Sequence, residues 1–299
     1  MPLTRIFCAD PGLKKEGRQV ALPMAECLKC AATRNNPCNF TYEMLKSMYE
    51  GQQNRGDNIS TTAVLAKCPR QFVLERREPY AQYPQELWDR YRGTIIHRVL
   101  EENMAPGDWG EVRVWAPVPG LGGEFISCQP DLVSPSQGIL WDYKTAKSDS
   151  LPKYGDPWPD HEAQLQVNRW IIDNAVEVEA EDGVRVPLLD SMRPDEWTSL
   201  KIVYVTDKTM AVYDVTKSIQ VPKVDGNGTK AKRVVDIWSD DQVLNYMVPR
   251  YVERRQALEM YPQEVPPVPE EYRDRSMTGF PCDWCPVRKD CFELQLAGQ

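Results

Sequence analysis

The sequence lacks any long apolar run, and this excludes one broad class of protein. No stretch approaches the ~18 consecutive apolar residues that a transmembrane helix requires. The first residues, MPLTRIFCADPGLKKEG, lack the apolar core of a signal peptide, so we expect a cytoplasmic protein with no membrane partner. There is no internal repeat. Hydrophobic residues make up 41% and charged residues 27%, a globular balance that excludes wholesale disorder.

Positive charge is also scarce, because the 299 residues carry a formal net charge of −8. Taken alone, this balance disfavours a nucleic-acid partner. The charge is uneven, however: residues 1–98 hold 15 Lys and Arg against 10 Asp and Glu (+5), and the remainder hold 21 against 34 (−13). A basic N-terminal part and an acidic remainder can give different faces of the protein opposite electrostatic fields. The net charge therefore does not exclude a polyanionic partner.

Cysteine, by contrast, is abundant and clustered. Nine cysteines are many for a cytoplasmic protein, and an odd number argues against a simple disulfide framework. Residues 1–58 read as a small cysteine-rich module, whose thiols match a tetrahedral zinc site in number: Cys8, Cys27, Cys30 and Cys38. The alternative is a set of unpaired thiols in a loosely ordered arm. Cys128 stands alone and is expected to be a small buried side chain.

Helix and strand patterns fill the rest of the chain. Ser60 is a candidate cap for a helix that runs to residue 77, and an apolar residue at every fourth position predicts a second helix over 84–103. Further patterns predict strands at 111–118, 124–133 and 138–145, followed by a helix over 160–176. A hairpin around 207–209 and a loop at 222–233 come next. The last predicted helix runs from 239 to about 260, with Ser239 and Gln242 as its capping box. This order gives an α/β or α+β core of about 200 residues.

Asp131, Asp142 and Lys144 form the strongest chemical pattern. Asp142 and Lys144 are two residues apart on a predicted strand and therefore share a face. Two converging carboxylates can hold a hard divalent cation, and a lysine beside them can orient a water or stabilise charge on a phosphate. The plain alternative is an ion pair on a solvated face.

Two helical positions could complete such a site. His97 lies one turn from both Gly93 and Glu101, where an imidazole could add a nitrogen ligand. Gln164 lies on the next predicted helix, where its amide could bind phosphate, and Gln166 is the competing choice.

The segments GTIIHRVLEE, QPDLV, WDYKTA and EAQLQVNRWII resemble, in order and spacing, the RecB-type nucleases of the PD-(D/E)XK superfamily. The resemblance covers roughly residues 60–295 and implies a restriction-endonuclease-like core, a mixed β-sheet flanked by helices. It implies that His97, Asp131, Asp142 and the Tyr143 carbonyl bind Mg²⁺ or Mn²⁺, and that Lys144 and Gln164 are catalytic. Asn168 stands where the family has tyrosine, so the Q-x-x-x-Y motif is only half present.

The last cysteines sharpen this resemblance. Cys282, Cys285 and Cys291, with Cys68 ahead of the core, are similar to the iron–sulfur subgroup of these nucleases, which includes CRISPR-associated RecB-like exonucleases and their phage relatives. The resemblance implies a [4Fe–4S] cluster that ties the end of the chain to its first helix. A zinc ion held by the same four thiolates is the alternative.

The expectation is therefore a metal-dependent DNA exonuclease acting on single-stranded ends, with residues 59–299 as the nuclease domain and a helicase or integrase as a possible partner. Arginines near the first helices are the expected phosphate contacts: Arg70, Arg76, Arg77 and Arg92. The alternative is a nuclease-fold DNA-binding or assembly subunit without turnover.

Overall fold

The computed structural model describes residues 3–8, 14–15, 18–33, 40–50, 56–148, 151, 157–215, 236–270, 282, 285–288 and 291. Cys38 and the predicted loop at 222–233 lie outside the described residues. The chain divides into two compact units. Unit 1 contains residues 1–57, 66–94 and 253–299, and unit 2 contains residues 58–65 and 95–252.

Unit 1 is assembled from both ends of the chain. Strand β1 (Leu3–Phe7) pairs with β4 (Ala21–Pro23) in antiparallel and with β5 (Tyr80–Gln82) in parallel orientation, and β2 (Lys14–Lys15) pairs with β3 (Arg18–Gln19). Its helices are α1 (Met24–Ala31), α2 (Tyr42–Glu50), α4 (Pro69–Arg77) and the first part of α5 (Pro84–Glu101). The core buries Leu3, Cys27, Leu74 and Cys291 together. The C-terminal cysteines thus belong with the N-terminal segment, whereas the sequence predicted a boundary at residue 58.

Unit 2 contains two four-stranded sheets. One has the order β13–β12–β9–β8, and the other has the order β11–β10–β6–β7. The first comprises β8 (Leu132–Ser134), β9 (Ile139–Thr145), β12 (Ser199–Val205) and β13 (Met210–Asp214); the second comprises β6 (Val114–Pro117), β7 (Phe125–Cys128), β10 (Glu177–Glu179) and β11 (Arg185–Pro187). The 3-10 turns Pro135–Gln137 and Asp190–Met192 join some of these strands.

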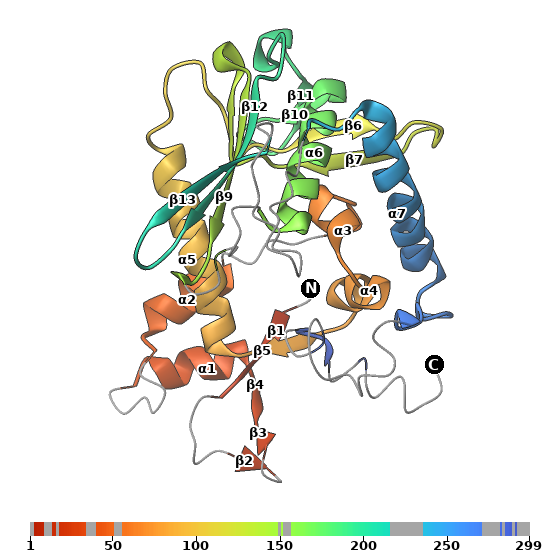
Figure 1. The fold of residues 1–299 in the computed structure, drawn as a ribbon. Coiled ribbons are helices and arrows are strands. Elements are labelled where there is room, and N and C mark those ends of the chain that lie inside the picture. The colour runs from red at the N-terminus through yellow and green to blue at the C-terminus, as the bar shows by residue number, and fades with distance from the viewer. Residues whose placement is uncertain are drawn as a thin grey trace, which may run out of the picture. The chain divides into compact units, whose positions relative to one another are not determined.

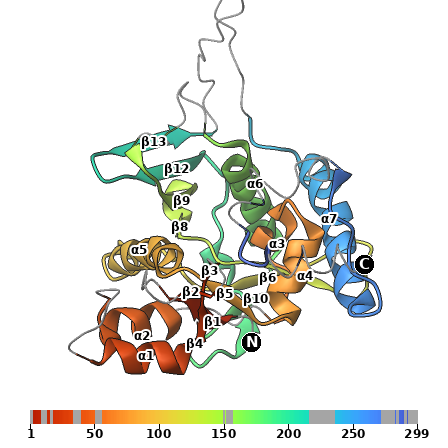
Figure 2. The same ribbon diagram turned by 90° about the horizontal axis from the view of Figure 1, so that it is seen from below.

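Helix α6 (Pro159–Asn174) packs between the strands of both sheets. It contacts β6 and β7 as well as β9 and β12 (Figures 1 and 2). Its residues from Glu162 to Ile172 are almost all buried. Strands β9 and β12 pair in parallel, and parallel neighbours need a crossover connection. Helix α6 is part of that connection. Helix α3 (Thr61–Leu65) also packs on α6. The result is a mixed α+β architecture, as expected for this order of elements.

Several predicted elements are confirmed. Helices α5 and α6 and the β12–β13 hairpin lie where their patterns placed them. Helix α7 (Asp240–Met260) contains Pro249 and begins at the predicted capping box, in which the Ser239 amide donates to Gln242 Oε1 at 2.8 Å and the Gln242 amide donates to Ser239 Oγ at 3.3 Å.

Two predicted elements are each broken by a proline. The helix expected over 60–77 is two helices, because Pro69 forces Cys68 into an extended conformation (φ −121°, ψ 114°) between α3 and α4. The strand expected over 124–133 is interrupted around Pro130, and its halves, β7 and β8, belong to different sheets. Among the described residues, no helix combines the length and apolarity needed to cross a bilayer.

Candidate metal centre

Asp131 lies at the interruption between β7 and β8, where the chain passes from one sheet of unit 2 to the other. Its Oδ2 accepts a hydrogen bond from the Tyr143 amide at 2.5 Å, and its Oδ1 lies 3.4 Å from His97 Nδ1. Only 12% of the side chain is exposed. Asp131 is therefore held in one orientation by two neighbours.

Asp142 and Lys144 lie on β9 and share a face, as predicted. Lys144 Nζ donates to Asp142 Oδ1 at 2.7 Å. Asp142 is 2% exposed, and its Oδ2 is buried without a hydrogen-bond partner among the described residues. An unpartnered buried carboxylate oxygen is costly, so Asp142 Oδ2 is a candidate ligand atom for a cation.

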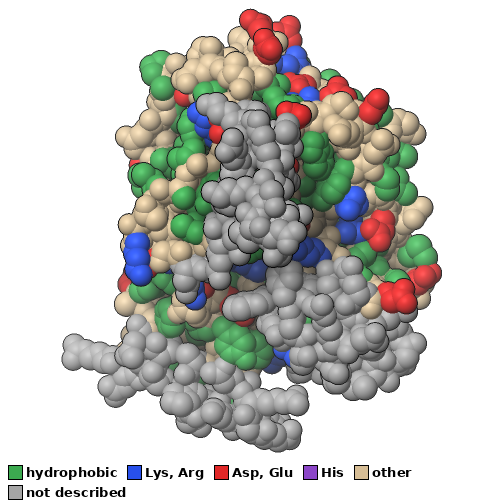
Figure 3. All heavy atoms as spheres, in the orientation of Figure 1, with side chains coloured by type: hydrophobic (Ala, Val, Ile, Leu, Met, Phe, Trp, Pro, Cys, Tyr) green, Lys and Arg blue, Asp and Glu red, His purple; other side chains and the backbone are tan. Residues whose placement is uncertain are grey.

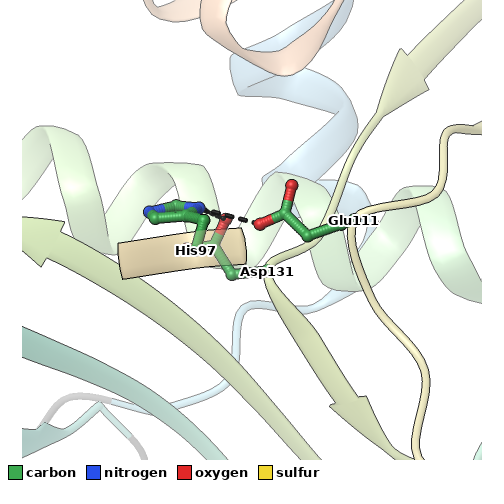
Figure 4. Close-up of side chains that lie close together, drawn as sticks. All are labelled: His97, Glu111 and Asp131. Carbon is green, nitrogen blue, oxygen red and sulfur yellow. Dashed lines mark hydrogen bonds and ion pairs between the residues drawn. The ribbon is translucent and has the colours of Figure 1, made fainter. Parts of the chain in front are cut away.

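His97 completes a compact group with Asp131 and Glu111. His97 Nδ1 lies 2.8 Å from Glu111 Oε1, and His97 Nε2 lies 3.2 Å from the Tyr143 carbonyl. In the part of the chain that the structure describes, the ligand atoms of His97, Glu111 and Asp131 all lie within 4.8 Å of one another (Figure 4). A nitrogen and two carboxylates at this spacing suit a divalent cation.

Glu111 was missed by the sequence reasoning, which treated it as the first residue of a strand. It lies three residues before β6 and has a left-handed backbone (φ 56°), rare for a residue with a side chain. The preceding Gly110 is also constrained, because a Cβ at this position would lie 2.2 Å from the Asp131 carbonyl oxygen. The available signal was the Gly110-Glu111 pair at the start of the first predicted strand of the core.

Burial and mutual charge shift the pKa values of this group. Burial lowers the pKa of His97, but the hydrogen bond to Glu111 and the charges of Asp131 and Glu111 outweigh it and raise that pKa to about 9. Burial and the neighbouring Asp142 charge raise the pKa of Asp131 to about 7. Burial lowers the pKa of Lys144, but Asp142 and Asp131 outweigh it and keep the ammonium charged. Without a cation, the centre therefore holds protons near neutral pH.

We expect cation binding to this centre to strengthen steeply with pH. A cation must displace the protons held by His97, with its pKa of about 9, and by Asp131, with its pKa of about 7. Proton competition is greatest below pH 7 and fades above pH 9, so Mn²⁺ affinity should rise more than ~100-fold between pH 6 and pH 8. Titration calorimetry in two buffers of different ionisation enthalpy measures the affinity and the released protons. An affinity that stays flat over this range contradicts the expectation.

The structure separates the two candidate glutamines on α6. Gln166 is fully buried and anchors the segment before α7, because its Nε2 donates to the Asp236 carbonyl at 3.1 Å and its Oε1 accepts from the Trp238 amide at 2.9 Å. Gln164 is half-buried. Asn168 is buried, and its Oδ1 has no hydrogen-bond partner among the described residues. Gln166 is thus structural, which leaves Gln164 as the glutamine available to a ligand.

Four cysteines lie within electrostatic reach of one another in unit 1. Burial raises the pKa of Cys68, Cys285 and Cys291. The charge of Cys282 further raises the pKa of Cys68 and Cys291, and Cys68 and Cys291 do the same to Cys285. None of the four is in a disulfide. Only Cys291 is fully buried, and among the described residues no three of these four thiols form a compact ligand group. Thiols that repel one another when ionised would be stabilised by a positively charged centre.

The remaining described cysteines differ in their burial. Cys27 is buried in the core of unit 1, and Cys8 and Cys30 are partly exposed, while Cys38 is outside the described residues. Within the described part of the chain, no three of these thiols form a compact ligand group. Cys128 is 2% exposed, with its Sγ 3.9 Å from the Asn168 carbonyl, so it is the buried small residue that was expected.

The four arginines predicted to contact phosphate have different surroundings. Arg70 is 3% exposed, donates to the Pro266 carbonyl at 2.5 Å and hydrogen-bonds Cys291, so its guanidinium does not face solvent. Its burial overturns the expected phosphate contact, because the side chain is built into the cysteine cluster. Arg76 stacks on Phe72, exposed Arg77 pairs with Asp57, and Arg92 is half-exposed. On the face in Figure 3, outside the grey atoms, Lys and Arg are scattered among other side chains.

Comparison with known proteins finds likeness to solved structures alone. No family model matches the chain, and no curated protein matches it. A crystal structure of SSO0001 aligns with 18% identical residues over 70% of this chain and 83% of that one, with a TM-score of 0.39. A TM-score of this size carries no argument about function, so the proposals below depend on the residues themselves.

Proposed function

We propose that this protein is a divalent-metal-dependent DNA nuclease with a PD-(D/E)XK core in unit 2. The observation that carries the proposal is the proximity of two pairs, His97 with Asp131 and Lys144 with Asp142, in one partly buried centre where the charge of Asp142 acts on Asp131. Asp142 lies outside the compact group of His97, Glu111 and Asp131, but its Oδ2 has no hydrogen-bond partner among the described residues. The resemblance to RecB-type nucleases implies the same four residues as the site. The parallel β9–β12 pair and the packing of α6 against it support the same core.

The donor set fits Mg²⁺ or Mn²⁺. Asp131, Asp142 and His97 would hold the ion, with the Tyr143 carbonyl available beside His97 Nε2. When bound, such an ion polarises a phosphate oxygen and lowers the pKa of a water. The protein residues supply positioning and charge around it.

Lys144 has the central chemical role in this proposal. Its ammonium is anchored by Asp142 and kept charged by both aspartates, so it can bind the phosphate or orient the attacking water. Gln164, on the adjacent helix, is proposed to bind a neighbouring phosphate. Hydrolysis forms a bond from the water oxygen to phosphorus and breaks a bond from phosphorus to a sugar oxygen.

The test is cleavage of end-labelled single-stranded DNA by the full chain. We expect digestion with Mn²⁺ or Mg²⁺, none with EDTA, and recovery when Mn²⁺ is restored in excess. A covalently closed single-stranded circle should survive if the enzyme requires ends, and labels at the 5′ and 3′ termini report the direction. DNA binding without any metal-dependent cleavage contradicts the proposal and favours the non-catalytic subunit. Co-purification with a helicase or an integrase would place the enzyme in a larger assembly.

We also propose that Cys68, Cys282, Cys285 and Cys291 bind a [4Fe–4S] cluster in unit 1. Their mutual effect on pKa supports one shared site, and buried Arg70 provides a positive charge beside Cys291. Thiolates suit iron–sulfur clusters and zinc alike, so metal analysis distinguishes the two.

A further inference from the structure

We infer that Glu111 is an additional ligand of the cation at this centre and that Gln129, oriented by Arg113, is the positioning residue that aims it. The inference deepens the proposed function, because it concerns the same cation site. The resemblance to RecB-type nucleases does not imply a role for the Glu111 carboxylate. Gln129 and Arg113 are polar residues outside the proposed set of ligands.

A single amide fixes the Glu111 side chain. Gln129 Nε2 donates to Glu111 Oε2 at 3.1 Å and to the Glu111 carbonyl at 3.0 Å. These two bonds tie the carboxylate to its own backbone and leave Oε1 directed at His97 Nδ1, 2.8 Å away. Figure 4 shows Glu111 pointing at His97 and Asp131.

Arg113 determines which way the Gln129 amide faces. Its Nη2 donates to Gln129 Oε1 at 3.0 Å, and its Nη1 lies 3.4 Å from the hydroxyl of buried Ser127. A guanidinium has only donors, so the amide oxygen must face Arg113 and the amide nitrogen must face Glu111. Outer partners of this kind commonly orient metal ligands and are costly to remove.

The backbone holds Glu111 in place from the other side. Its amide donates to the Pro130 carbonyl at 2.8 Å, and Trp109 exchanges two hydrogen bonds with Val133, at 3.0 and 2.7 Å. Glu111 is thereby pinned, in its left-handed conformation, against the segment that carries Asp131. Strained backbone of this kind persists where the surroundings enforce it and is concentrated at functional sites. If Glu111 served only to neutralise a protonated His97, this degree of positioning would not be needed.

The experiment compares Mn²⁺ binding by full-length variants. Glu111→Gln removes the ligand and Gln129→Met removes the positioning amide at similar length. Exposed Glu181→Gln and Gln137→Met are the matched controls. We expect Gln129→Met to weaken Mn²⁺ binding about 10- to 100-fold and Glu111→Gln to weaken it at least as much, with the controls unchanged. Calorimetry gives the affinity, and electron paramagnetic resonance reports the bound ion.

Two further measurements make the outcome decisive. Thermal unfolding in EDTA shows whether each variant is folded, and excess Mn²⁺ should restore DNA cleavage in Gln129→Met. Wild-type Mn²⁺ affinity in folded Glu111→Gln or Gln129→Met overturns the inference. Mn²⁺ binding that depends on both residues, in a protein that cuts no DNA, supports the inference and overturns only the proposed function.

Discussion

Replacing Lys144 with alanine should reduce the rate of single-stranded DNA cleavage by about 10²- to 10⁴-fold, the range found when a positioned proton-transfer or charge-stabilising group is lost. Lys144 is the one cation paired with Asp142, at 2.7 Å, among the described residues. Its removal eliminates its restraint on that aspartate and its proposed contact with the phosphate. The rate is measured with end-labelled DNA at saturating Mn²⁺.

Lys147→Ala is the matched control, because Lys147 is three residues further along the chain and exposed. It should cleave at the wild-type rate. Since Lys144→Ala leaves a buried aspartate without its partner, thermal unfolding with and without Mn²⁺ must accompany the assay. A folded Lys144→Ala protein that digests DNA as fast as the wild type would remove the catalytic assignment.

Replacing Cys285 with serine should abolish the visible colour of anaerobically purified protein and reduce its bound iron from about four atoms per chain to a small fraction of that. Cys285 interacts electrostatically with both Cys68 and Cys291, so its replacement removes one of the four thiols of this group. We also expect unit 1 to become less stable, because a bound cluster would contribute its binding free energy to folding.

Cys128→Ser is the control for this experiment. Cys128 is more deeply buried than Cys285 and lies in unit 2, where a serine hydroxyl can still donate to the Asn168 carbonyl. It should retain iron and colour. A wild-type protein that contains zinc and no iron would falsify the cluster assignment without affecting the nuclease centre in unit 2.

Local patterns predicted the parts of the centre that lie on regular elements. Asp142 and Lys144 share a face because strand side chains alternate, and that rule needs no tertiary information. The capping box at Ser239 is equally local, since both of its hydrogen bonds span three residues.

Non-local features could not be predicted in the same way. Glu111 reaches Asp131 because backbone bonds to Pro130 and Val133 fold its segment against a later one. Arg70 looked like a phosphate-binding residue from its charge, yet it is buried beside Cys291, 221 positions further along the chain (291 − 70). Burial and partner choice at such separations depend on topology, which the pattern of one segment does not contain.

The interruption between β7 and β8 has a mechanical consequence. The chain changes sheets near Pro130, so one ion bound by Asp131 and Asp142 would connect the segment between β7 and β8 to β9. If Glu111 also bound this ion, the segment before β6 would be connected as well. The ion would then act as a cross-link in addition to the Tyr143–Asp131 hydrogen bond and the packing of α6 on both sheets. An ion present at 100 times its dissociation constant adds about 2.7 kcal/mol to the stability of the folded state. The same carboxylates that prepare the centre for chemistry would therefore make the integrity of unit 2 respond to the supply of divalent cations.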